Sequence, residues 1–229
     1  MTESVSSLGP LQKVPPDMPI SRDEAIDIGV QGAGLAASLV GVGAMLDHAA
    51  FTGRPEAVGA SLIYGLTLVA MFSFSLLNTV IRNPRRQAVI RLLDHSFIYC
   101  LIAGTYTPFC LLVLGGETGW RLLIIMWLAA ALGVILRVVL HKRFQHALIT
   151  LYVAMGWAGV VHADLIASRL STSGLILLVA GALLYTVPAP LHRFTRLKYH
   201  SAIWHGCVLA AAACHYAMVL LMFDLPFSN

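Results

Sequence analysis

Asp94 and His95 stand side by side near the start of a long apolar segment, which runs from Leu92 to Gly115. A carboxylate inside a membrane-spanning helix costs about 2.5 to 3.5 kcal/mol at the helix centre and less near an end. Such a residue is expected to serve a function, so Asp94 is the first candidate for a functional residue. The alternatives are that Asp94 only caps a helix start or pairs with Arg91.

A second candidate is His205, which lies at least one helical turn inside the last apolar segment. A neutral imidazole at this depth is suited to metal ligation or to proton transfer. The alternative is a histidine that only forms hydrogen bonds within the core. His215 lies about 80° further around the same helix, at about 100° per residue, and is not expected to share the site.

Polar residues also recur in the second apolar segment. Ser75, Asn78 and Thr79 have the spacing i, i+3 and i+4, which places them on one face of a helix. We expect Asn78 near the depth of Asp94, with Ser75 and Thr79 lining the same pocket. The alternative is that these side chains only form hydrogen bonds between neighbouring helices.

The composition shows which elements must position these residues. Only 11% of the 229 residues are charged and 58% are apolar, whereas a soluble chain carries about 25% charged residues. The surplus apolar surface predicts a protein whose solvent is lipid. Seven segments have the roughly 20 apolar residues that a spanning helix needs: 26–47, 57–81, 92–115, 119–140, 146–167, 173–191 and 201–223.

The predicted fold is therefore all-α, a bundle of seven transmembrane helices. Residues 1–24 are polar and contain four prolines, and we expect them to form a flexible cytoplasmic tail. Residues 25–229 are expected to form one membrane domain. Pro108 is expected to kink the third helix, where Thr105 and Thr107 can bind the freed backbone groups.

The distribution of basic residues predicts the orientation. Of the 15 Lys and Arg residues, 12 lie in the tail and in alternate connections, while Arg54, Arg121 and Arg169 lie on the other side. The positive-inside rule then places the N-terminus in the cytoplasm and the C-terminus outside. The basic balance therefore reflects topology and contact with anionic lipid, and no nucleic-acid partner is expected.

Several short motifs resemble the hemolysin III family of bacterial membrane proteins, which is related to the progestin and adiponectin Q receptors. The resemblance covers essentially all seven segments and predicts a protein of the bacterial cytoplasmic membrane. The matching stretches are LDHS at 93–96, AGTYTPF at 103–109, TGW at 118–120, AMGW at 154–157 and AIWH at 202–205.

The resemblance implies a zinc site near the cytoplasmic face. In zinc-bearing members, three histidines hold the metal, one from a Ser-x-x-x-His motif in the second span and two from a His-x-x-x-His motif in the last. The aspartate that matches Asp94 orients a metal-bound water, which gives Asp94 the catalytic role. Related receptors are thought to hydrolyse the amide of ceramide-like lipids.

This sequence departs from that pattern at two of the three ligands. Asn78 or Thr79 stands in place of the second-span histidine, and Ser201 stands at the first ligand position of the last span. His205 matches the remaining ligand. His200 lies five residues before it, about 140° away around a regular helix, whereas ligands at i and i+4 lie about 40° apart.

Asn78, His200 and His205 are thus the candidate metal ligands, with Asn78 as a weak one, and Ser75, Thr79 and Ser201 line the site. Gln31, four residues after Asp27, stands in place of a first-span histidine. None of the four cysteines forms a CxxC pair, so no thiolate zinc site is expected. Either zinc is absent, or the start of the last span distorts so that His200 turns inward.

Three functions compete at this point. A zinc-dependent hydrolase of ceramide-like lipid amides would use His205, Asp94 and His200. A non-catalytic protein of the same fold would act in lipid homeostasis or sensing, with membrane lipid as its partner and the polar residues as a hydrogen-bonded network. A lytic or transport protein is the third. We favour the second, and the degenerate site leaves catalysis open.

Overall fold

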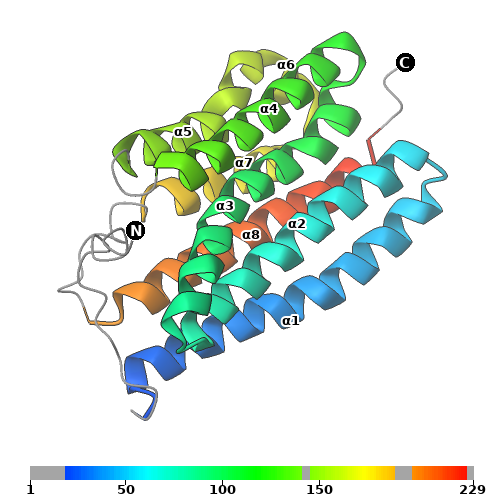
Figure 1. The fold of residues 1–229 in the computed structure, drawn as a ribbon. Helices are drawn as coiled ribbons and strands as arrows, with labels where there is room; N and C mark the ends of the chain where they lie inside the picture. The colour runs from blue at the N-terminus through cyan, green and yellow to red at the C-terminus, as the bar shows by residue number, and fades with distance from the viewer. Residues whose placement is uncertain (1–18, 141–144, 189–197, 226–229) are drawn as a thin grey trace.

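The computed structural model describes residues 19–140, 145–188 and 198–225, and in these ranges it contains only helices (Figure 1). This confirms the all-α prediction for the part of the chain that is described. The eight α-helices are α1 (Arg22–Phe51), α2 (Pro55–Val80), α3 (Pro84–Pro108), α4 (Gly116–Leu140), α5 (Gln145–Trp157), α6 (Ala163–Arg169), α7 (Thr172–Thr186) and α8 (His200–Met222).

Within the described residues, six stretches of helix are long and apolar enough to cross a membrane. Four are the helices α1, α2, α4 and α8; the other two are α3 together with the π-helix that follows it, and the run Ala147–Arg169. Helix α7 is apolar but has only 15 residues. Its addition gives the seven predicted segments, of which the end of the sixth (189–191) lies outside the described residues.

Local sequence signals set the starts of these helices. The Ser21 hydroxyl accepts a hydrogen bond from the Glu24 amide and so caps α1, whose first turn carries two acidic residues. Asn83 caps α3 in the same way, with Pro84 at the first helical position. Because of the Ser21 cap, α1 begins at Arg22, and residues 22–24 belong to the helix rather than to the predicted tail.

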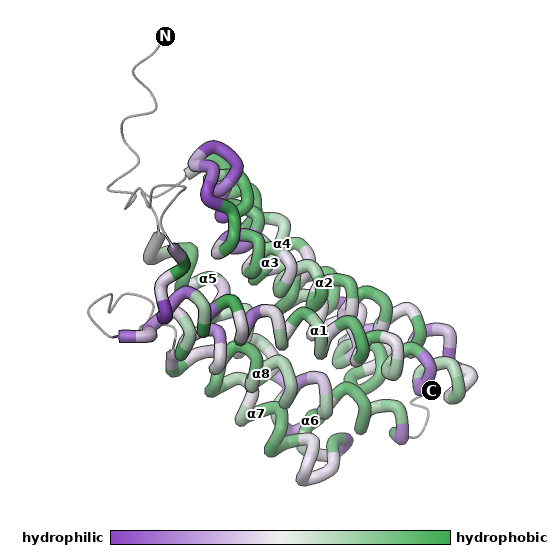
Figure 2. Tube along the Cα trace, turned by 90° about the horizontal axis from the view of Figure 1, so that it is seen from below, coloured by the Kyte–Doolittle hydropathy of each residue, from purple (hydrophilic) through white to green (hydrophobic). Residues whose placement is uncertain are grey.

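The helices form a ring in chain order. Each span packs against the next, and α8 returns to pack against α1, while α3 also touches α8 inside the bundle (Figure 1). Figure 2 shows hydrophobic residues along most of the helices and hydrophilic residues near their ends. Large apolar side chains such as Val40 and Leu128 are exposed on the outside, as expected for a surface that faces lipid.

Two spans depart from regular α-helix. After Pro108, the third span continues as a π-helix, Phe109–Leu114, instead of the expected simple kink. Thr105 and Thr107 donate to the carbonyls of Leu101 and Ala103, at 2.8 and 2.9 Å. The prediction that these threonines bind the freed backbone groups is therefore wrong, because they bind carbonyls one turn before themselves and not the Gly104 carbonyl that Pro108 leaves without its helical N–H donor.

The fifth span is interrupted by a 3-10 helix, Ala158–His162, between α5 and α6. The hydroxyl of Tyr106 on α3 bridges this interruption. It donates to the Gly156 carbonyl at 3.2 Å and accepts from the Gly159 amide at 2.8 Å. One side chain of α3 thus binds backbone groups on both sides of the break.

Candidate functional site

A cavity of about 620 Å³ lies inside the bundle, bordered by α2, α3, the fifth span, α7 and α8. Its size falls within the range of roughly 300–1,000 Å³ typical of small-molecule sites. Most of its wall is apolar. Polar residues from four spans line it beside the first half of α3 and the start of α8, namely Ser75, Asn78, Thr79, Asp94, His95, Arg137, Ser201 and His205.

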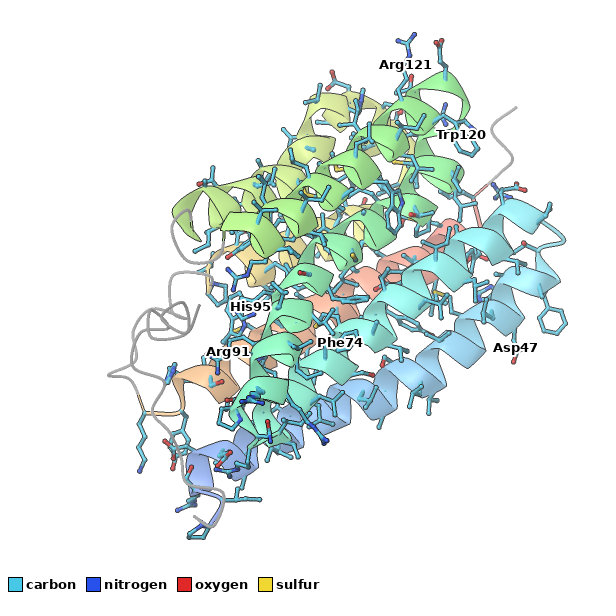
Figure 3. The ribbon with its side chains drawn as sticks, viewed as in Figure 1. Asp47, Phe74, Arg91, His95, Trp120 and Arg121 are labelled. Carbon is cyan, nitrogen blue, oxygen red and sulfur yellow. The ribbon has the colours of Figure 1, made fainter. Side chains whose placement is uncertain are left out.

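The polar part of the wall lies toward one end of the bundle. Figure 3 labels Arg91 and His95 in the first half of α3, and Trp120 and Arg121 toward the opposite end of the bundle. Along α8, the lining runs from Ser201 to Met218, which is about 25 Å at 1.5 Å per residue. The cavity is therefore long, with most of its polar groups at one end and a mainly apolar wall beyond them, in which His215 is an exception.

His205 is the centre of a hydrogen-bonded cluster. Its Nδ1 lies 2.6 Å from the Oδ1 atom of Asp27, and its Nε2 lies 3.2 Å from the Ser75 hydroxyl. The second carboxylate oxygen of Asp27 accepts a hydrogen bond of 2.8 Å from Ser201. Asp27 and Ser75 are each only 4% exposed, so the first, second and last spans meet here in a buried polar contact.

Gln31 on α1 also belongs to this cluster. Its amide nitrogen lies 3.0 Å from the Thr79 hydroxyl and 3.1 Å from Nδ1 of His205. Nδ1 carries either a hydrogen or a lone pair, not both. Because the carboxylate of Asp27 is the closer partner and only accepts, we assign the hydrogen to Nδ1. Nε2 is then free to accept the hydrogen of the Ser75 hydroxyl.

Asp94 belongs to a second, neighbouring group. Its Oδ2 atom accepts a hydrogen bond of 3.1 Å from the Asn78 amide, and Nδ1 of His95 lies 3.4 Å from the same oxygen. Asn78 follows Ser75 by three residues on α2, so the two groups are neighbours on one helix face. The structure therefore brings Asp94 and His205 to the wall of one cavity, each with its own partners.

The other predicted residues take different places. Ser75, Thr79 and Ser201 line the cavity as expected. His200 is the first residue of α8 and is not one of the residues that line the cavity in the described part of the chain. His215 reaches the cavity wall further along α8, and its Nε2 lies 3.4 Å from the Leu178 carbonyl.

Asp27 is the functional candidate that sequence reasoning missed. It was noted only as a neighbour of Gln31, although a carboxylate inside an apolar segment is the signal that selected Asp94. Asp27 and Gln31 are four residues apart, so they face the same side of α1. Their partners on α2 and α8 could not be derived from that spacing.

The donor set does not fit a zinc ion. Zinc in proteins takes about four ligands from imidazole, thiolate and carboxylate groups. In the described ranges, no group of three or more His, Cys, Asp or Glu side chains is placed to hold a metal. Both nitrogens of His205 already have protein partners, Asp27 and Ser75, and Asp94 is bound by Asn78.

The fold and its apolar helices define a helical integral membrane protein. The family model described as Haemolysin-III related matches residues 22–216, and the chain therefore belongs to this family. It is 36% identical to hemolysin-3 of Bacillus cereus over 208 residues, which cover 91% of this chain and 94% of the relative. It is 31% identical to a hemolysin-3 homolog of Bacillus subtilis (strain 168) over 199 residues, 87% of this chain and 93% of the relative.

A more distant relative comes from animals. The human monocyte to macrophage differentiation factor is 28% identical over 162 residues, which cover 67% of this chain and 66% of the relative. These similarities confirm the resemblance to the hemolysin III family that the sequence motifs indicated.

Proposed function

We propose that the protein binds a lipid inside its cavity and acts in lipid homeostasis or sensing in the bacterial cytoplasmic membrane. The observation that carries this proposal is the shape and chemistry of the cavity, which is long, mainly apolar, and polar at one end. A lipid has the same division, with an apolar chain and a polar head. The chain would lie along α8 toward Met218, and the head would meet the groups around Asp94 and His205.

The polar end is proposed to work as a hydrogen-bonded network without zinc. This proposal is supported by the contacts of the His205 imidazole, which lies against Asp27, Gln31 and Ser75. A zinc-dependent amidase would need imidazole ligands that Thr79 or Asn78 and Ser201 do not supply. The name hemolysin-3 is that of the Bacillus relatives, and lysis by this protein can be measured directly.

The polar end is proposed to face the cytoplasm. The connections at this end carry most of the basic residues, while Arg54, Arg121 and Arg169 stand at the other. Single cysteines at Arg85 and Arg121, introduced into a chain without its four native cysteines, test the orientation in intact cells. A membrane-impermeant maleimide should label the second and spare the first, and the reverse pattern would refute the proposed orientation.

Lipid binding is tested with purified protein in nanodiscs and a dansyl-labelled long-chain fatty acid as the probe. Ala182 lines the cavity, so Ala182→Phe should fill it and reduce binding at least tenfold. Ala131→Phe is the matched control, because Ala131 is exposed on the outside of α4. Equal binding by the two variants would contradict the cavity as the lipid site.

Metal analysis and a lysis assay complete the test. The wild-type protein is expected to retain well under one zinc per chain after purification in the presence of zinc. About one zinc per chain, lost in His205→Ala, would favour the metal-dependent hydrolase instead. Release of haemoglobin from red cells by the wild type and equally by Ala182→Phe would place lysis outside the cavity.

A further inference from the structure

We propose that Asp27, His205 and Ser75 form a catalytic triad that hydrolyses the ester bond of a single-chain lipid. Ser75 is the nucleophile, His205 is the general base and Asp27 orients the imidazole. The inference rests on the proposed function, because the lipid must first enter the cavity that Ser75 and His205 line.

The distances match the requirements of such a triad. A nucleophile and its base must lie within hydrogen-bond reach, about 2.6 to 3.2 Å, and a third group must orient the base. Here the Ser75 hydroxyl lies 3.2 Å from Nε2 of His205, and Asp27 lies 2.6 Å from Nδ1. The three residues come from three spans, α2, α8 and α1, so this arrangement is not a result of local helix geometry.

Neighbouring groups hold Asp27 and His205 in the productive arrangement. Ser201 donates to the carboxylate oxygen of Asp27 that does not face the imidazole. Gln31 lies beside Nδ1, and its amide nitrogen donates to Thr79 rather than to Nδ1, which carries a hydrogen. With Nδ1–H directed at Asp27, the Nε2 lone pair faces the Ser75 hydroxyl, which is the tautomer that a general base requires.

Asn78 supplies a donor for the oxyanion that forms during the reaction. Its amide nitrogen has two N–H groups, and within the described residues the amide makes one hydrogen bond, to Asp94. Asn78 is three residues after Ser75 and lines the same cavity. An amide N–H in this position stabilises negative charge on the carbonyl oxygen under attack.

The acceptors at the polar end indicate the alcohol part of the substrate. The Oδ1 atom of Asn78 is buried without a hydrogen-bond partner in the described part of the chain, and Asp94 presents a carboxylate beside it. Both accept hydrogen bonds, so they suit the hydroxyl groups of an alcohol. We therefore assign the substrate class as a long-chain monoester of a neutral polyol such as glycerol.

The reaction proceeds in two balanced steps. Ser75 Oγ attacks the ester carbonyl carbon as its proton passes to Nε2 of His205, and the carbon–oxygen bond to the alcohol then breaks. The alcohol leaves with that proton, and the acyl group remains on Ser75. Water, the second reactant, gives a proton to His205 and attacks the acyl carbon, so that the fatty acid is released and Ser75 Oγ regains the proton.

Covalent labelling tests the triad directly in the full-length protein in nanodiscs. A fluorophosphonate with a short alkyl chain should add its mass to the peptide that contains Ser75. Ser75→Ala and His205→Gln should abolish this label. Ser73→Ala, on the same helix but not among the described residues that line the cavity, is the matched control and should be labelled like the wild type.

Hydrolysis of 1-monooleoylglycerol gives the second readout. Ser75→Ala should lower the turnover at least about 10³-fold, while EDTA should leave wild-type turnover unchanged. Absence of both label and turnover in a wild type that binds the dansyl fatty acid would overturn the triad and leave lipid binding intact. Turnover that survives Ser75→Ala or is lost with EDTA would also overturn it.

If the proposed lipid binding is wrong, the labelling and binding assays give a different set of results. A wild type that is labelled at Ser75 but does not bind the dansyl fatty acid or hydrolyse the monoester would refute lipid binding, and with it the assigned substrate class. Ser75→Ala should bind the fatty acid with wild-type affinity, because its hydroxyl bonds only to His205 in the described residues. If Ser75→Ala bound the fatty acid tenfold more weakly, Ser75 would also bind the lipid, and the proposal that it acts only as a nucleophile would be wrong.

Discussion

Nδ1 of His205 lies 2.6 Å from a carboxylate oxygen of Asp27, although 178 residues separate the two in the sequence. This contact joins the first span to the last. It also leaves the opposite ring nitrogen directed at Ser75 on the second span. The stability of the bundle and the chemistry of its cavity therefore depend on the same buried carboxylate.

Replacing Asp27 by leucine should destabilise the protein by about 1–3 kcal/mol. The change leaves the Nδ1–H of His205 and the hydroxyl of Ser201, both partly buried, without their acceptor, and an unsatisfied buried donor costs about this much. Thermal unfolding in nanodiscs measures the effect. Asp47→Leu, at an exposed position near the end of the same helix (Figure 3), should be close to neutral, and equal effects of both changes would contradict the prediction.

Restoring the family's histidines should create a zinc site. The double variant with Ser201→His and Thr79→His adds two imidazoles near His205, and zinc needs about four ligands of this kind. We expect about one zinc per chain by atomic emission, against far less in the wild type. Ser201→His with Asn78→His tests the alternative alignment, and no zinc in either double variant would show that the helices hold these positions too far apart.

Replacing Tyr106 by phenylalanine should loosen the fifth span. The change removes the hydrogen bonds to Gly156 and Gly159 across the 3-10 break, each worth about 0.5–1.5 kcal/mol. Hydrogen exchange should increase between α5 and α6. Tyr216→Phe is the control, because Tyr216 makes a single hydrogen bond among the described residues, to the Gly41 carbonyl. It should cost less and leave the fifth span unchanged.

Gly104 allows α2 and α3 to approach closely. A Cβ atom at this position would overlap the side chain of Thr67 on α2, so Gly104→Ala should destabilise the bundle by about 1–3 kcal/mol. Gly43→Ala places its Cβ in open space and should stabilise α1 slightly, by about 0.5–1 kcal/mol. Unfolding of the two variants in one detergent series should therefore move in opposite directions.

Composition and length were sufficient to predict the helical class and the positions of the apolar spans, because lipid requires about 20 apolar residues per span. The interruptions were harder to predict. Pro108 marks one of them, but whether the chain kinks or forms a π-helix depends on packing against neighbouring helices. The break after Trp157 has no proline, and only the structure shows that Tyr106 stabilises it.

The candidate site was predictable in part for a similar reason. Asp94 and His205 stood out because ionisable groups are rare inside spans, and Ser75 and Asn78 because of their helical spacing. Which of them become partners depends on the rotation and depth of each helix. The sequence therefore did not predict Asp27 as the partner of His205, because only the packing of α8 against α1 brings the two side chains together.

The closing of the ring by α8 has a consequence for biosynthesis. The first six spans can enter the membrane and anchor the chain, yet the imidazole that completes the polar cluster arrives only with α8. A nascent chain stopped before His200 would therefore be embedded in lipid without an organised pocket. Whatever chemistry this pocket performs therefore begins only once α8 has joined the bundle.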